Sequence, residues 1–210
     1  MDIQNKNRKL LKKNHVYDET MEHDACGVGL VASTEGLKSR KVVEYGIEAL
    51  KAVWHRGAID ADGKTGDGAG IHIEIPNDFF AEKIEITGHE HDNSDLCVGM
   101  IFLPRNDFGG QEQCRSIVES ELTKKNFNIY GWRQVPVDPS VLGEKAEQTR
   151  PEITQVLFTH NDKSIHGKDL ERALYETRRK IEKEALRNQL NNFYICSFSS
   201  KSIIYKGMFL

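Results

Sequence analysis

The alternation of short apolar runs with helical patterns is the feature that most constrains this chain. From Ala25 to the C-terminus the two patterns alternate without an internal repeat or a low-complexity linker. Such alternation predicts one compact α/β or α+β unit rather than a string of separate domains. The 210 residues are enough to bury roughly 70% of the surface that the unfolded chain exposes.

The period of the apolar residues places the expected elements. Residues 71–75 alternate isoleucine with polar side chains, as in a half-buried strand that closes at Pro76. Apolar residues at steps of three and four place one stripe on a helix over 39–54, and the run 26–33 predicts a buried strand. Further strands are expected at 96–103, 129–137, 153–159, 193–199 and 203–206, and further helices at 78–86, 110–126 and 167–190.

Charge and hydropathy exclude several classes of partner. The 29 Lys and Arg residues against 32 Asp and Glu residues give a net charge of −3, so no global basic field favours nucleic acid. The mean hydropathy is −0.56, and no apolar run approaches the roughly 18 residues of a membrane span. We therefore expect neither nucleic acid nor a membrane as partner, and a small molecule as substrate.

The cysteine pattern indicates neither a metal site nor a disulfide framework. The four cysteines are far apart and form no CxxC pair. Cys97 and Cys196 lie in apolar, strand-like runs, where a free cysteine usually behaves as a small hydrophobic residue. The histidines of the loop 89–93 are not expected to form a dedicated metal site. These features predict a reducing, cytoplasmic setting.

The first 25 residues are basic but lack the hydrophobic stretch of a secretory signal. Leu10-Leu11 is the longest purely apolar run before Cys26. Two interpretations remain, a solvated basic arm and a leader that is removed before Cys26.

Three segments could carry chemistry: Asp24–Gly27, His55–Ala58 and Thr65–Ile71. Each also has a structural interpretation. Cys26 could be a core residue, the cations of the second segment could bind carbonyls at a helix end, and the glycines of the third could form a tight turn. The third segment lacks the GxxxxGK[ST] pattern and precedes a strand, which disfavours nucleotide binding.

A nucleophilic cysteine requires a base, and the sequence offers two. One is a side chain such as His55. The other is the α-amine that cleavage before Cys26 would create, whose ordinary pKa of about 8 suits it to accept the thiol proton. The second possibility also gives the 25-residue leader a purpose.

In order and separation, the three segments resemble the start of the glutamate synthase large subunit. The matching residues are Cys26-Gly-Val-Gly, His55-Arg-Gly-Ala58, Thr65-Gly-Asp-Gly-Ala-Gly-Ile71 and the stretch 193–207. That start is a glutaminase domain, a class II glutamine amidotransferase with the N-terminal-nucleophile hydrolase fold. The resemblance, which extends from about Tyr17 to the last residue, therefore implies an α+β fold with four layers, α/β/β/α.

The resemblance also implies roles for individual residues. Residues 1–25 would be removed, and Cys26 would attack the side-chain amide of L-glutamine. Arg56 would bind the substrate α-carboxylate through its guanidinium fork, with His55 as structural support. Gly57, Asp67 and Gly68 would shape the pocket wall.

Other features of the family are expected outside this sequence. The family's Asn-Gly oxyanion pair, and the aspartate that contacts the substrate amine, would lie beyond Leu210. The domain over 26–210 is thus expected to be an amino-terminal portion, incomplete at its C-terminus and as a catalyst, and to hold no cofactor. FMN and an iron–sulfur cluster would belong to later domains, and an electron-donating subunit or ferredoxin would be a partner of the whole enzyme. The alternative is a non-catalytic binding or assembly module.

Overall fold

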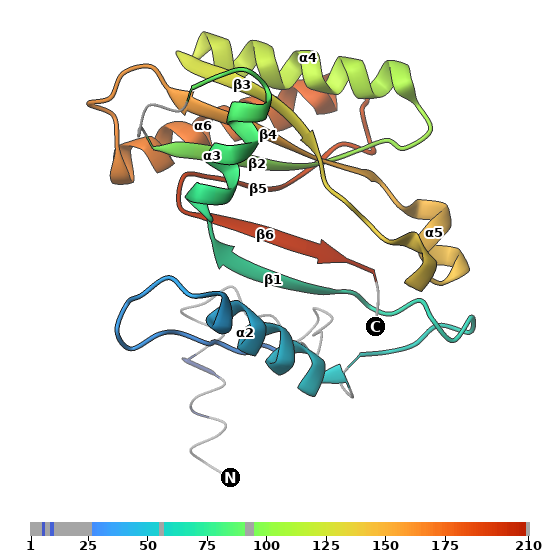
Figure 1. Ribbon diagram of the computed structural model, residues 1–210. Coiled ribbons are helices and arrows are strands. Elements are labelled where there is room, and N and C mark those ends of the chain that lie inside the picture. Colours follow the sequence, from blue (N-terminus) through green and yellow to red (C-terminus); the bar gives the residue numbers. More distant parts are fainter. Residues whose placement is uncertain (1–5, 7–8, 11–26, 55–56, 91–94, 209–210) are drawn as a thin grey trace.

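The chain forms four stacked layers. The computed structural model describes residues 27–54, 57–90 and 95–208, together with Lys6, Lys9 and Leu10. Figure 1 shows long helices over a larger sheet, a smaller sheet beneath it, and a further helix below the smaller sheet. This arrangement of mixed helices and antiparallel sheets confirms the α+β fold and its four-layer order.

The larger sheet is antiparallel throughout. In spatial order its strands are β3 (Phe127–Gln134), β4 (Glu152–His160), β2 (Leu96–Leu103) and β5 (Tyr194–Ser199). β2 is buried along nearly its whole length because strands flank it on both sides and other layers cover both faces. Its continuous apolar sequence therefore reflects a central position in the sheet.

Two helices cover the outer face of this sheet. They are α4 (Phe108–Lys124) and α6 (Gly167–Arg187). The Asp107 carboxylate caps α4 by accepting a hydrogen bond of 2.8 Å from the Gly110 N–H. The core between the helices and the sheet contains Cys97, Ile101, Val118, Phe158, Leu174, Ile181 and Phe198.

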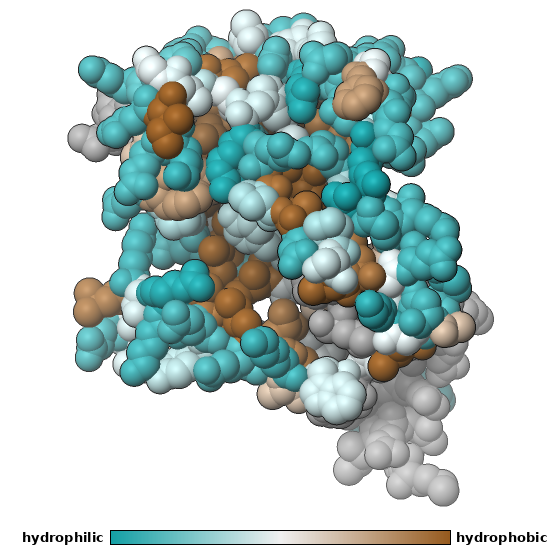
Figure 2. Space-filling model, turned by 45° about the vertical axis from the view of Figure 1, so that its right-hand side comes forward, coloured by the Kyte–Doolittle hydropathy of each residue, from teal (hydrophilic) through white to brown (hydrophobic). Residues whose placement is uncertain are grey.

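A second core lies between the two sheets. The smaller sheet pairs β1 (Ala69–Glu74) antiparallel with β6 (Ser202–Gly207), and α3 (Asn77–Ile86) packs beside it. Buried members of this core include Ile75, Phe80, Ile84, Met100, Leu157 and Ile203. Figure 2 shows hydrophobic side chains that reach the surface between the upper and lower parts of the molecule.

The fourth layer is α2 (Arg40–Ala52), which the Ser39 side chain caps by accepting from the Lys41 N–H. Its apolar stripe is half-buried, and no residue of the helix is fully buried. Trp54 lies beyond the end of the helix and is 68% exposed. The expected helix over 39–54 is therefore confirmed with a shorter C-terminal end.

All the other expected helices, and every expected strand except one, are present within a few residues of their predicted bounds. The exception is the run 26–33. Residues 27–33 form no strand, and Val28 and Leu30 are 91% and 92% exposed. Their apolar pattern suggested a buried strand, but a strand requires a hydrogen-bonded partner, and no described strand pairs with them.

Between β3 and β4, the described part of the chain contains short helices that were not predicted from the sequence. They are the 3₁₀ turn η2 (Pro139–Val141) and α5 (Glu144–Thr149). Six residues are too few to show a helical apolar period. None of the helices in the described part of the chain is long and apolar enough to cross a membrane.

Gly99 of β2 tests the tightness of the outer core. A Cβ at Gly99 would lie 2.7 Å from Val156 Cγ1 and 2.8 Å from the Phe198 ring. We expect Gly99→Ala to lower the free energy of unfolding, measured in urea, by about 1–3 kcal/mol because overpacking must displace that ring. Gly109→Ala is the matched control, since its nearest neighbour would be at an ordinary 3.6 Å, and an equal loss in both variants would contradict the packing argument.

Candidate active site

Three of the predicted site residues lie outside the described part of the chain: Cys26, His55 and Arg56. Their described neighbours nevertheless lie close together. A Cβ at Gly27 would be 3.2 Å from Val53 Cβ, and one at Gly29 would be 4.0 Å from Ala49 Cβ. The residues that follow Cys26 therefore run antiparallel along the last turns of α2 and begin where that helix ends.

Residues 57–68 form a single hairpin-like loop, which we call the site loop. Its two sides are joined by an isolated bridge between Ile59 and Gly66 and by a hydrogen bond of 2.9 Å from the Asp60 N–H to the Thr65 carbonyl. At its base, the Asp67 carboxylate accepts a hydrogen bond of 2.9 Å from the Ala58 N–H. The second and third sequence segments are thus two sides of one loop, and Asp67 holds them together.

The glycines of the third segment have a structural explanation. Gly68 has a φ of +108°, and a Cβ there would lie 3.0 Å from the Gly207 carbonyl oxygen. At Gly70 a Cβ would be 2.9 Å from the Tyr205 carbonyl oxygen. Both glycines are required because β1 approaches β6 closely. A role of Gly68 in substrate binding stays a prediction.

Gly57 differs from these two glycines. It is exposed, and its N–H closes a turn by donating to the Trp54 carbonyl at 3.0 Å. A Cβ at Gly57 would lie 3.4 Å from that same oxygen, which is an ordinary contact. Packing among the described residues therefore does not explain the glycine, and its predicted place in the pocket wall remains a prediction.

The three described cysteines are unsuited to nucleophilic chemistry. Cys97, Cys114 and Cys196 are free and buried. Burial raises the pKa of all three thiols, that of Cys114 to about 11, and nearby carboxylates add to the effect at Cys97 and Cys114. A thiol is nucleophilic as its thiolate, so a raised pKa makes these three thiols poor nucleophiles. Because they are buried, they pack as small hydrophobic side chains, as predicted for Cys97 and Cys196.

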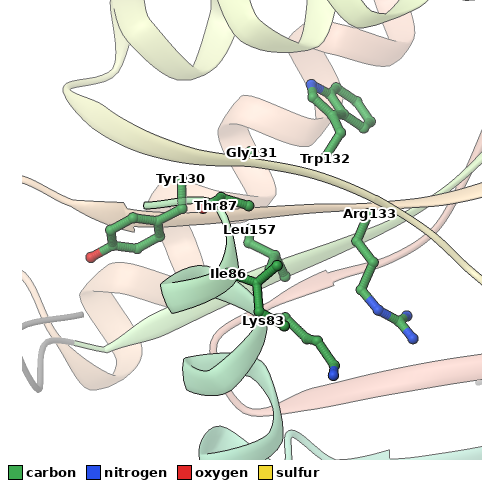
Figure 3. A pocket seen from close by; sticks show the side chains of 8 residues that line it. All are labelled: Lys83, Ile86, Thr87, Tyr130, Gly131, Trp132, Arg133 and Leu157. Carbon is green, nitrogen blue, oxygen red and sulfur yellow. The ribbon is translucent and has the colours of Figure 1, made fainter. Parts of the chain in front are cut away.

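A pocket of about 200 Å³ lies elsewhere, between the end of α3 and β3 (Figure 3). Its two cations are already in contact with other groups: Lys83 and Arg133 lie over the Phe79 ring, and Arg133 also donates to Gln155. None of its lining residues belongs to the three sequence segments, so this pocket is not the predicted site. The lining residues are Lys83, Ile86, Thr87, Tyr130, Gly131, Trp132, Arg133 and Leu157.

Among the described residues, no three His, Cys, Asp or Glu side chains are grouped so that they could hold a metal ion.

Residues 26–210 match the family model of the class II glutamine amidotransferases. The matched region begins at Cys26 and includes the site loop, β1 and β6, which are the elements that the structure brings together. The chain therefore belongs to the class II glutamine amidotransferase family.

Within this class the chain is similar to glutamate synthases. It is 53% identical to the glutamate synthase (NADPH) large chain of Azospirillum brasilense over 204 residues, which are 97% of this chain and 13% of that protein. It is 38% identical to ferredoxin-dependent glutamate synthase 2 of Synechocystis and 39% identical to the ferredoxin-dependent glutamate synthase of Pyropia yezoensis. Each of these two matches covers 89% of this chain and 12% of the relative.

Sequence reasoning missed the residues that hold the tip of the site loop. Asp60 and Lys145 form an ion pair, and the Thr65 side chain reaches α5. These partners are more than 80 residues apart, and α5 itself was not expected. Only the composition of the segment, two aspartates and a threonine in a glycine-rich loop, could have suggested a hydrogen-bonded turn.

The raised pKa values of the three described cysteines predict that an alkylating reagent leaves them unmodified in the folded chain. With iodoacetamide at pH 8 we expect Cys97, Cys114 and Cys196 of the folded chain to stay unlabelled. A pKa of about 11 leaves roughly one Cys114 thiol in a thousand ionised, against about a quarter for an ordinary cysteine. Peptide mass spectrometry reads the result, and labelling in urea is the control. Rapid labelling of any of the three in the folded chain would contradict their assignment to the core.

Proposed function

We propose that the chain contributes the nucleophile half of a glutaminase site, in which Cys26 attacks the side-chain amide of L-glutamine. The observation that carries this proposal is the convergence of the three motif segments. The residue after Cys26 lies against Val53, and the residues after Arg56 are tied to Asp67. Membership of the class II amidotransferases supports the same chemistry.

The proposed reaction needs a free amine at Cys26. Removal of residues 1–25 would expose the α-amine, which takes the thiol proton. The thiolate then forms a bond to the amide carbon of glutamine, and the tetrahedral intermediate collapses with loss of ammonia, to which the amine returns the proton. Water hydrolyses the γ-glutamyl thioester to glutamate and restores the thiol.

Arg56 is the proposed partner of the substrate α-carboxylate. A guanidinium can hold a carboxylate with two parallel hydrogen bonds and stays charged at any physiological pH. Arg56 precedes Gly57 at the start of the site loop, and Asp67 fixes that start by accepting from Ala58. The loop would thus set where the carboxylate binds, and Gly57 and Gly68 would leave room for it.

The ammonia has a proposed use. The chain spans about one eighth of the curated relatives that it matches, and those relatives are glutamate synthases. We propose that the ammonia feeds the reductive formation of glutamate from 2-oxoglutarate in such an enzyme. FMN and an iron–sulfur cluster in other domains, with a partner subunit or ferredoxin as electron donor, would supply the electrons.

The glutamine analogue 6-diazo-5-oxo-L-norleucine tests the nucleophile. Because the oxyanion pair is expected beyond Leu210, the assay uses a whole glutamate synthase that carries this chain as its amino-terminal portion. There we expect the analogue to modify Cys26 covalently and excess glutamine to protect against it, with intact mass and a peptide map as the readout. Cys26→Ser should abolish labelling, and Cys114→Ser, which removes a buried thiol, should leave it unchanged. Labelling that persists without the Cys26 thiol would refute the assignment.

Arg56 can be tested in the same assay. We expect Arg56→Lys to raise the analogue concentration for half-maximal labelling rate at least tenfold, because an ammonium cannot reproduce the two-point contact with the carboxylate. Arg115→Lys on the outer helix α4 is the matched control. A concentration dependence equal to that of the unchanged chain would remove Arg56 from the substrate site.

A further inference from the structure

The tip of the site loop is built around one carboxylate. Asp62 Oδ1 accepts hydrogen bonds from the Lys64 N–H at 3.0 Å and the Thr65 N–H at 2.7 Å, and Oδ2 accepts from the Thr65 hydroxyl at 2.5 Å. These bonds hold the pKa of Asp62 well below its ordinary value, with the Thr65 hydroxyl as the largest cause. The tip is therefore a charged, fully hydrogen-bonded turn at neutral pH.

This turn is fastened to α5. Thr65 is only 5% exposed, and its hydroxyl oxygen accepts from the Ala146 N–H at 3.4 Å. Gly143, directly before α5, lies so close that a Cβ there would overlap both Asp62 Oδ2 and Thr65 Oγ1. The contact between the two segments therefore requires a glycine on one side and the Asp62–Thr65 pair on the other.

An ion pair adds a second connection. Lys145 Nζ donates to both oxygens of the Asp60 carboxylate, at 2.9 and 2.7 Å. The same contact lowers the pKa of Asp60 and raises that of Lys145, so both groups are charged at neutral pH. Lys145 is exposed and Asp60 is partly exposed, so the pair contributes little stability by itself, and its effect is to orient the tip.

α5 is in turn fixed to the body of the domain. The Glu147 carboxylate accepts from Arg105 Nη1 at 2.5 Å and from Arg150 Nε at 2.7 Å. Arg105 follows β2, the central strand of the larger sheet, and Arg150 precedes β4. A continuous set of contacts thus leads from the larger sheet through α5 to the tip of the site loop.

We propose that α5 is an anchor that positions the site loop for glutamine binding, with Asp62, Thr65 and Lys145 as positioning residues. This inference rests on the proposed function. The tip is fixed by α5, the middle by the Ile59–Gly66 bridge and the base by the Asp67–Ala58 hydrogen bond. A loop held at all three levels presents its base, where Gly57 and Asp67 lie, in one geometry. Such preorganisation improves binding because the loop does not have to be ordered when the substrate arrives.

The inference predicts a specific kinetic pattern. Asp62→Asn keeps the size of the side chain but replaces one acceptor oxygen with a donor group. We expect the concentration of 6-diazo-5-oxo-L-norleucine for half-maximal labelling of Cys26 to rise at least fivefold, with the limiting labelling rate changed less than twofold. The chemistry at Cys26 is untouched, whereas the loop that receives the substrate is loosened.

Hydrogen exchange supplies a second readout on the same full chain. We expect the Ala58 amide to exchange at least fivefold faster in Asp62→Asn, although Asp62 does not contact it, because the base of the loop loses its fixed tip. Asp162→Asn is the matched control. Asp162 accepts from the Ser164 N–H and hydroxyl in a similar turn, away from the site loop, and its replacement should change neither readout.

A charge exchange tests the ion pair. Asp60→Lys and Lys145→Asp should each weaken labelling in the same way as Asp62→Asn, and the double variant should restore at least half of the loss.

The inference is overturned, and the proposed function is not, if the original chain is labelled normally and Asp62→Asn changes neither readout. These readouts are the analogue concentration for half-maximal labelling and the exchange rate of the Ala58 amide. A chain that begins at Cys26 and is not labelled at all would overturn the proposed function, and the inference with it.

Discussion

Burial of β2 on both faces is the constraint on which the rest of the structure depends. β2 carries apolar side chains on both faces of the sheet, so a layer must cover each face. The helices α4 and α6 cover one, and α3 with the β1–β6 sheet covers the other. Because β6 lies on this inner face and pairs with β1, the glycine-rich segment is placed at the end of the smaller sheet, where β1 begins and β6 ends. The position of the candidate site therefore follows from how the central strand is covered.

Close backbone contacts and hydrogen-bonded carboxylates together shape the site loop. Gly68 and Gly70 are glycines because β6 carbonyls approach them, and Asp67 holds the start of the site loop through the Ala58 N–H. The described cysteines are packed in the cores with raised pKa values. In the proposed function, the site loop would form one wall of the site, and Cys26 and Arg56 would come from the segments that border it.

Much of this fold could be predicted from the sequence because its signals are local. The isoleucine alternation at 71–75 identified β1, and the apolar stripe after Ser39 identified α2. The prediction of a strand over 26–33 was wrong because an apolar pattern does not show whether a pairing strand is present. The helix α5 was not predicted because its six residues are too few to show a helical period of apolar side chains. The bond from Ala58 to Asp67 and the ion pair of Asp60 with Lys145 depend on how distant segments meet, which no periodicity encodes. The motif spacing indicated the candidate site, whereas the hydrogen bonds within the site loop could be found only from the structure.

The proposed function requires Cys26 to act as an amino-terminal nucleophile. The most direct test is the intact mass of the expressed protein together with its N-terminal sequence, because this measurement does not depend on turnover. We expect a chain that begins at Cys26, with residues 1–25 removed. A homogeneous chain that retains Ala25 and the basic residues before it would contradict this role of Cys26, since the thiol would then lack the amine that is proposed to activate it. A binding or assembly module would then be the better description.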